Sequence, residues 1–162
     1  MYNELMQKAT FAAGCFWGVE DIFRAIPGVE NVIVGYTGGT TQNPSYEQVC
    51  TGTTGHAEGV EVTFDEKQVS YEKLLQVFFE NHNPTTVNRQ GPDVGSQYRS
   101  AVFYHDDAQK AAAEKMIAEL TKNQAFGTKQ IVTEIVPAQT FWKAEEYHQE
   151  YLKKHGLSSC HI

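Results

Sequence analysis

The chain has 162 residues, the length of one domain and enough to bury a core without disulfides or metal. Hydrophobic residues make up 41% and charged residues 20%, a balance that excludes a disordered chain. The 20 Asp and Glu outnumber the 13 Lys and Arg, giving a net charge of −7. This charge excludes nucleic acid as the main partner, because phosphate binding needs clustered cations.

The apolar runs and the cysteines indicate the environment of the protein. No run of 18 apolar residues exists, so we expect no membrane span and no membrane partner. Residues 1–8 are polar and mixed in charge, unlike a secretory signal, which predicts a cytoplasmic protein. Cys15, Cys50 and Cys160 are widely spaced and odd in number, so they do not predict a structural disulfide framework. Cys50 is expected to be structural.

Hydrophobic periodicity predicts the elements of the first half of the chain. In order they are a strand at 9–13, a helix at 16–26, a strand at 29–36 and a strand at 59–65. The last strand alternates cleanly, with Val60, Val62 and Phe64 on one face. Residues 37–58 are rich in Gly, Thr, Asn and Pro, and so long a loop in a compact domain is usually functional.

The second half begins with helices that have clear N-caps. In order we expect a helix from Ser70 to Pro84, a strand at 101–104, a helix from Asp106 to Asn123, a strand at 130–136 and a helix from Thr140 to Lys154. A second polar loop covers 83–97. Residues 1–156 are expected to form the domain, and 157–162 a flexible C-terminal tail.

The order of these elements predicts the fold class. The first six read β-α-β-β-α-β, which matches the split βαβ pattern of ferredoxin-like domains. We therefore expect one α+β domain with a mixed sheet, helices packed on it and long functional loops.

Cys15 has the surroundings of a nucleophile. It lies at a strand-to-helix junction, between Gly14 and Phe16. The helix N-terminus would direct free N–H groups at the sulfur, stabilise the thiolate and lower the thiol pKa. Phe16 and Trp17 would wall an apolar pocket beside it. The alternative is a small buried hydrophobic residue, the commoner fate of a lone cysteine.

Four polar residues in the loops are candidates for proton donation. Glu58 begins the alternating strand, and a carboxyl beside aromatic rings would have a raised pKa and donate a proton. Tyr46 and Tyr98 could present phenol O–H donors, and Asp93 lies in the second loop. The alternatives stay open: a solvated Glu58, ordinary half-buried tyrosines and a turn aspartate.

Cys160 lies in the predicted tail, where a mobile thiol can reach an oxidised cysteine and form a disulfide with it. A stray exposed thiol is the alternative. The six histidines show no H-x-x-H or H-x-x-x-H pair, so we expect no metal site.

Six segments, taken together and in this order, resemble the type A peptide methionine sulfoxide reductase family. They are residues 14–18 (GCFWG), 35–39 (GYTGG), 43–46 (NPSY), 55–58 (GHAE), 90–100 (QGPDVGSQYRS) and 141–148 (FWKAEEYH). The resemblance runs from about Phe11 to Tyr151, nearly the whole chain.

The resemblance implies reduction of the S epimer of methionine sulfoxide, free or in peptides and proteins. Carried onto the matching positions, it makes Cys15 the nucleophile and Glu58 the acid that protonates the sulfoxide oxygen. It implies that Tyr46 and Tyr98 bond that oxygen and that Asp93 supports the polar network. Phe16 and Trp17 would hold the substrate methyl group.

The resemblance also implies how the enzyme is recycled. A Cys15 sulfenic acid would condense with Cys160 to a disulfide, which thioredoxin reduces. This cycle requires no cofactor: no metal, flavin or nucleotide. We expect a monomer. Tail cysteines vary within the family and this chain has only Cys160, so its resolving role is a hypothesis.

Two other functions are compatible with parts of the pattern. A Cys–Glu hydrolase or amidase would use a thioester intermediate and would need His56 as its base. A thiol-based redox sensor would switch Cys15 and Cys160 between dithiol and disulfide, but it would need no aromatic pocket or paired phenols.

Overall fold

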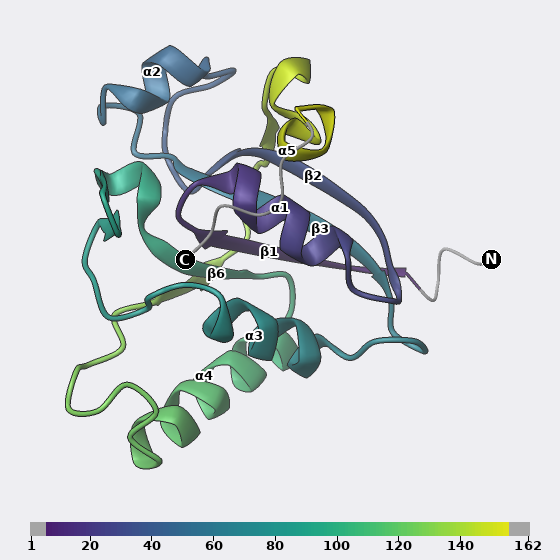
Figure 1. Ribbon diagram of the computed structural model, residues 1–162, viewed down its shortest axis with the longest axis vertical. Coiled ribbons are helices and arrows are strands. Elements are labelled where there is room, and N and C mark those ends of the chain that lie inside the picture. The colour runs from purple at the N-terminus through teal and green to yellow at the C-terminus, as the bar shows by residue number, and fades with distance from the viewer. Residues whose placement is uncertain (1–5, 156–162) are drawn as a thin grey trace.

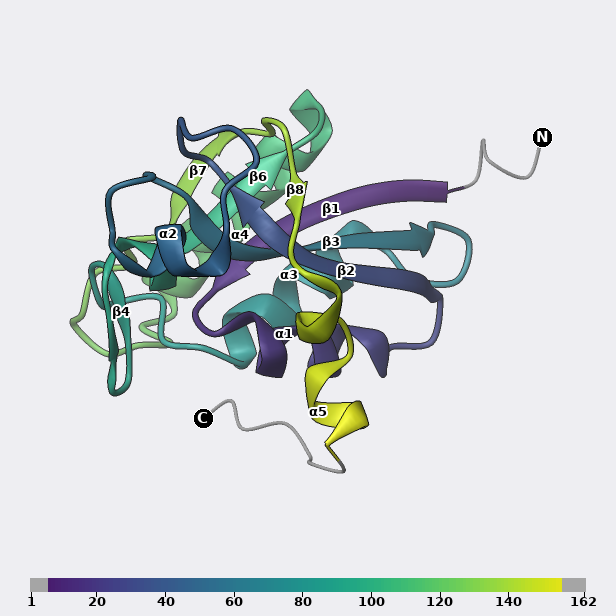
Figure 2. The ribbon, with the colours of Figure 1, turned by 90° about the horizontal axis from the view of Figure 1, so that it is seen from above.

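The computed structural model describes residues 6–155 of the chain. A six-stranded sheet runs through it in the order β7-β6-β1-β3-β2-β8, and a small hairpin, β4-β5, stands apart (Figures 1 and 2). The strands are β1 (Met6–Ala13), β2 (Val29–Thr37), β3 (Ala57–Asp65), β4 (Arg89–Gln90), β5 (Asp93–Val94), β6 (Ser100–Tyr104), β7 (Glu134–Pro137) and β8 (Trp142–Lys143). The chain is thus a mixed α+β protein with one sheet at its centre.

The pairings place the first strand in the middle of the sheet. β1 pairs antiparallel with β3 and with β6, and β2 pairs antiparallel with β3 and β8. Among the described strands, only β7 runs parallel to its neighbour, β6. The two strands that pair with β1, β3 and β6, are therefore both distant from it in the sequence.

Three of the five described helices begin at a residue whose side chain caps them. The five are α1 (Phe16–Arg24), α2 (Tyr46–Cys50), α3 (Tyr71–Glu80), α4 (Asp107–Lys122) and α5 (Tyr151–Lys154), with 3-10 turns η2 (Ser96–Tyr98) and η3 (Glu146–His148). Ser70 accepts a hydrogen bond from the Lys73 N–H and Asp106 from the Gln109 N–H, as N-caps do. These two predicted helix starts are confirmed.

The main core lies between the sheet and the helices α1, α3 and α4. Phe11 of β1 stacks on Phe23 of α1 and on Phe78 of α3, with ring centroids 5.2 and 5.1 Å apart. A smaller cluster on the other face of the sheet contains Ala12, Ala101 and Phe103. Alternate residues of β1 thus serve opposite faces, which fixes the register of the strand.

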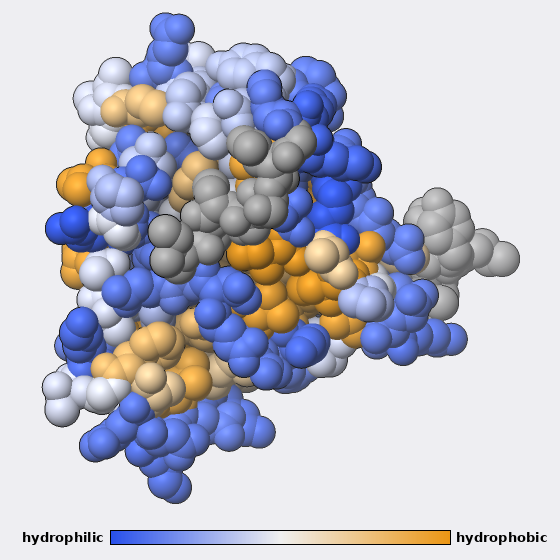
Figure 3. Space-filling model, viewed as in Figure 1, coloured by the Kyte–Doolittle hydropathy of each residue, from blue (hydrophilic) through white to orange (hydrophobic). Residues whose placement is uncertain are grey.

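Apolar side chains also reach the surface between α1 and α3 (Figure 3). A shallow depression there is lined in part by Val19, Ile22 and Val77. Both helices lie on the same side of the sheet, so this surface continues the core outward (Figure 2).

The helix predicted from Thr140 to Lys154 is wrong. This segment contains β8, the turn η3 and only the short α5. The Gln149 side chain accepts from the Val34 N–H and donates to the Val34 carbonyl oxygen, each at 3.0 Å. Glu150 has a left-handed backbone with φ of 53°. Contacts to the edge of β2 therefore outweigh the local helical pattern.

Candidate active site

The candidate site lies at the end of the sheet where β1 terminates. Figures 1 and 2 show α2 and the β4–β5 hairpin at this same end. Cys15 follows β1 directly and is the N-cap residue of α1, and its side chain is partly exposed. The predicted strand-to-helix junction at the thiol is therefore confirmed.

Glu58 is held at the first N–H of the same helix. It is 1% exposed, and its Oε1 accepts from the Phe16 N–H at 3.4 Å. Burial, assisted by the nearby Asp93 charge and opposed by the Phe16 hydrogen bond, raises the pKa of Glu58 to about 8. Within residues 6–155 its Oε2 has no hydrogen-bond partner. The structure excludes a solvated Glu58: the group is a buried carboxylic acid that is mostly protonated at neutral pH.

Two phenols face the same region from separate turns. Tyr46 is the first residue of α2, which a Ser45–Gln48 capping box initiates, and Tyr98 ends the turn η2. Burial raises the pKa of both phenols, and the Glu58 charge raises it further. Both therefore stay protonated and can donate a hydrogen bond.

Asp93 lies in β5 and is partly buried. Its charge contributes to the raised pKa of Glu58 and of Tyr98. Asp93 therefore belongs to the electrostatic surroundings of the site, and it lies in a strand two residues before Gly95 rather than in the turn that the sequence suggested.

Aromatic rings form a wall next to Cys15. The Phe16 ring lies 6.5 Å from the Tyr46 ring and 6.5 Å from the Trp17 ring. Trp17 stacks on Tyr151 of α5, with centroids 3.8 Å apart and planes within 10°. Rings from α1, α2 and α5 thus gather around the start of α1, directly after Cys15.

Two residues that were not predicted from the sequence, Glu145 and His148, support this wall. The Glu145 carboxylate accepts from the Tyr36 O–H at 2.8 Å and from the Tyr46 N–H at 3.0 Å. His148 is 1% exposed and accepts from the Trp17 indole N–H at 3.0 Å. Both lie in the segment 141–148 quoted for the family resemblance, and its mixture of charged and aromatic residues was the available signal.

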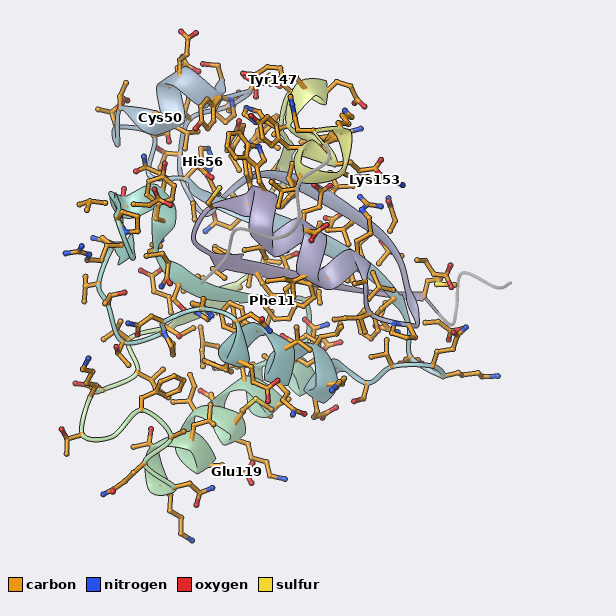
Figure 4. The ribbon with its side chains drawn as sticks, in the orientation of Figure 1. Phe11, Cys50, His56, Glu119, Tyr147 and Lys153 are labelled. Carbon is orange, nitrogen blue, oxygen red and sulfur yellow. The ribbon has the colours of Figure 1, made fainter. Side chains whose placement is uncertain are left out.

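Cys50 is exposed in α2, contrary to the structural role predicted for it. Burial raises the pKa of its thiol, while a hydrogen bond with the Tyr46 phenol lowers it. Figure 4 shows Cys50, His56 and Tyr147 at the same end of the molecule. Cys160 lies outside the described residues.

His56 does not serve as the base that the hydrolase alternative needs. Its Nδ1 accepts from the Gly39 N–H at 3.0 Å, so its Nε2 donates to the Thr41 carbonyl oxygen at 2.6 Å. Both ring nitrogens are occupied by backbone groups. His56 instead ties together the two ends of the loop that precedes β3.

Within residues 6–155 no group of three or more His, Cys, Asp or Glu side chains is arranged to hold a metal ion. No helix in that range is both long and apolar enough to cross a membrane.

Comparison with known proteins gives a consistent picture. Residues 7–162 match the family model described as peptide methionine sulfoxide reductase. The chain is 55% identical over 157 residues to a peptide methionine sulfoxide reductase MsrA of Acidobacterium capsulatum, covering 97% of this chain and 100% of that one. It is 58% identical over 156 residues to the MsrA of Methanothermobacter thermautotrophicus, covering 96% and 92%.

Solved structures agree with the sequence comparisons. Methionine sulfoxide reductase A of Corynebacterium diphtheriae has a TM-score of 0.90 and 38% identity, covering 96% of this chain and 78% of that one. Mxr1 of Saccharomyces cerevisiae in complex with Trx2 has a TM-score of 0.66 and 27% identity, covering 98% and 90%.

Proposed function

Because this chain belongs to the peptide methionine sulfoxide reductase family, we infer that it is an oxidoreductase that reduces methionine sulfoxide to methionine. It thereby repairs oxidised proteins. Thioredoxin recycles it, in line with the yeast relative that was solved in complex with Trx2.

The Cys15 thiolate is the proposed nucleophile. It attacks the sulfoxide sulfur, and the oxygen passes from that sulfur to the Cys15 sulfur. The methionine is reduced by two electrons, and Cys15 is oxidised by two electrons to a sulfenic acid. The position of Cys15 at the N-terminus of α1 supports this role, because the helix dipole stabilises an anion there.

Glu58 is the proposed acid, and its geometry is the single observation that carries this mechanism. A sulfoxide oxygen leaves sulfur poorly unless it is protonated. Glu58 is a buried acid with a pKa near 8 next to the residue that follows Cys15, and its Oε2 has no partner within residues 6–155. A neutral Glu58 also avoids placing a second negative charge beside the thiolate.

Tyr46 and Tyr98 are proposed to donate hydrogen bonds to the sulfoxide oxygen as charge develops on it. Their raised pKa values support this role, because the donors stay protonated. Fixed donors directed at a developing charge act as in an oxyanion hole. Asp93 is proposed to keep Glu58 protonated through its own negative charge.

Phe16 and Trp17 are proposed to bind the methyl group of the substrate. Their ring contacts with Tyr46, His148 and Tyr151 support this role, because they fix the orientation of two rings that directly follow Cys15. We also propose selectivity for the S epimer, which rests on the family resemblance.

Recycling is proposed to pass through a Cys15–Cys160 disulfide. The Cys160 thiol attacks the sulfenic sulfur, water leaves, and a disulfide forms. A thioredoxin dithiol then reduces that disulfide. We also propose a monomer as the active unit.

The proposed fold class is ferredoxin-like. The order β6-β1-β3-β2, with antiparallel pairing between all neighbours, supports a split βαβ core. In this description β7 and β8 extend the core at its two edges.

Separated S and R epimers of a methionine sulfoxide peptide, supplied with a dithiol, test the proposed function. The expected result is loss of one oxygen mass from the S epimer only, and no loss with Cys15→Ser. Absence of reduction of either epimer would overturn the proposal. Disulfide formation under peroxide without sulfoxide reduction would instead favour the redox-sensor alternative.

A further inference from the structure

His148 is a buried ring that the mechanism above does not use. Its ring centroid lies 5.2 Å from that of Phe16, 5.7 Å from Trp17, 4.5 Å from Tyr46 and 4.1 Å from Tyr147. It is therefore packed among the aromatic rings at the start of α1, next to Cys15, and it comes from an element distant in sequence from all but Tyr147.

The hydrogen bonds of His148 determine its tautomer. An indole N–H can only donate, so the Nδ1 that receives the Trp17 N–H at 3.0 Å carries a lone pair. A neutral imidazole then carries its proton on Nε2. This buried atom has no hydrogen-bond partner within residues 6–155, and it lies 4.0 Å from Glu145 Oε1. The carboxylate favours the Nε2–H tautomer by attracting the positive end of that bond.

Glu145 is itself fixed in place. Its carboxylate accepts from the Tyr36 O–H and from the Tyr46 N–H, so it cannot turn away from His148 without losing two hydrogen bonds. The contacts from Tyr46 to Glu145, then to His148 and then to Trp17 thus join the start of α2 to the start of α1. Tyr46 and Trp17, at the two ends of this series, are residues of the proposed site.

We propose that His148 is a positioning residue that holds the Trp17 indole in the substrate methyl pocket by accepting its N–H at Nδ1. The hydrogen bond fixes the edge of the indole, while the Tyr151 ring, 3.8 Å away, fixes its face. The hydrogen bond and the stacking contact together fix the orientation of the Trp17 indole. This inference rests on the proposed function, since Trp17 is assigned there to the methyl pocket.

Protonation of Nδ1 would break this hydrogen bond. The groups that face the ring are Phe16 and Trp17 from α1, Tyr46 from α2, and Glu145 and Tyr147 from its own segment, so Glu145 is the only charged one among the described contacts. Burial lowers the pKa of His148, and Glu145 opposes this in part. The hydrogen bond therefore persists at neutral pH and is lost only in acid.

Two variants separate a positioning role from a packing role. His148→Phe keeps a ring but removes the acceptor, whereas His148→Asn supplies an oxygen at the position of Nδ1. We expect His148→Phe to raise KM for a methionine sulfoxide peptide about tenfold, with a smaller change in kcat, because an unpaired indole N–H destabilises the bound orientation. His148→Asn should stay within about threefold of the parent KM. Equal KM values in the parent and His148→Phe would overturn the proposal.

The Trp17 indole also gives a readout that needs no activity. The chain has only two tryptophans, so Trp142→Phe assigns the two indole N–H resonances in a ¹⁵N-labelled sample. We expect the Trp17 resonance to move in His148→Phe and, in the parent, on acidification. The acid-dependent shift should disappear in His148→Asn, while the Trp142 resonance serves as the internal control.

If neither the His148 substitutions nor acidification changes the chemical shift of the Trp17 indole N–H, the proposal is overturned. The two failures are distinguishable: a parent protein that reduces no sulfoxide contradicts the proposed function, whereas an active parent whose Trp17 is indifferent to His148 contradicts this inference alone. Should His148→Phe not fold, the parent titration and His148→Asn still decide the question.

Discussion

Glu58 is a neutral acid in the folded protein because its side chain is 1% exposed. The hydrogen bond from the Phe16 N–H offsets only part of the cost of burying a charge there. An ionised carboxylate there would lose most of its hydration without gaining a cationic partner. The same burial that destabilises the charge keeps a proton available next to Cys15. At the scale of one residue, stability and proposed chemistry are therefore linked through one pKa.

The first prediction concerns the pH dependence of reduction. If protonated Glu58 supplies the proton, the single-turnover rate falls about tenfold per pH unit above pH 8, where its pKa lies. Glu58→Gln cannot transfer a proton, so its rate at neutral pH should fall by about 10²–10⁴ and this alkaline decline should vanish. Rapid-quench measurements from pH 6 to 10 check both effects, and an unchanged decline in Glu58→Gln would contradict the role.

The second prediction concerns folding stability. The pKa of Glu58 is raised in the folded state, so between about pH 4.5 and 8 the folded protein binds more protons than the unfolded chain. Its contribution to stability is therefore present at low pH and is lost as the pH rises through 8. Glu58→Gln removes this loss, so its stability relative to the parent should grow with pH by up to about 1.4 kcal/mol per unit.

Urea unfolding at pH 5, 7 and 9 measures this difference. Glu119→Gln is a matched control, because Glu119 is exposed on α4 at the opposite end of the molecule (Figure 4). A parent and Glu58→Gln pair whose stability difference is constant with pH would refute the assignment.

The segment from β8 to α5 has a helical sequence pattern, but its contacts with the sheet determine its structure. Its side chains, not a helix, join it to the sheet: Gln149 bonds both backbone groups of Val34 beyond the end of the β2–β8 pairing. Glu145 and His148 then reach α2 and α1. The segment covers the edge of β2 and braces the site with the same few residues.

The third prediction tests how closely this segment packs. An added Cβ at Gly35 would overlap with the Trp142 carbonyl oxygen and lie 2.5 Å from the Phe141 ring. Gly35→Ala should therefore lower the free energy of unfolding by about 3 kcal/mol and reduce activity, because β8 must shift. Gly52→Ala is the control: its Cβ meets nothing within 4 Å, and only its φ of +77° opposes the change, by about 1 kcal/mol.

Chemical denaturation of the two variants compares them directly. Equal losses would show that the packing at Gly35 is looser than the geometry indicates.

Local signals explain which elements the sequence could predict. The alternation in β3 and the Ser70 and Asp106 caps depend on neighbours in the chain, and these predictions are confirmed. The helix from Thr140 was wrong because Gln149 and Glu145 find partners far away in sequence. Glu58 was a candidate because of its place at the start of the alternating strand, and the family resemblance gave its role, but its depth of burial depends on β2 and α1 together.

The same distinction applies to the site. Cys15 was predictable because a strand-to-helix junction is a local feature. His148 was not, since its role depends on an indole from α1 and a carboxylate from its own segment meeting in space. Cys50 was predicted to be structural from its apolar neighbour, yet α2 turns it outward.

The fourth prediction concerns the whole molecule and its reductant. Cys160→Ser should still reduce one equivalent of sulfoxide per enzyme, because Cys15 remains, but should stop cycling with thioredoxin, because the proposed disulfide cannot form. Counting methionine released with and without thioredoxin measures both quantities. Cys50→Ser is the comparison variant and should keep cycling with thioredoxin. Full thioredoxin-driven turnover by Cys160→Ser would contradict the proposed role of Cys160 as the resolving cysteine.

The central place of β1 has a consequence for biosynthesis. The ribosome releases the N-terminal strand and Cys15 early, but β1 acquires its two neighbours only after β3 and then β6 have emerged. Such nonlocal pairing slows folding. During translation the nascent chain therefore exposes a thiol without its acid, and the reactive centre assembles only once most of the domain has been synthesised.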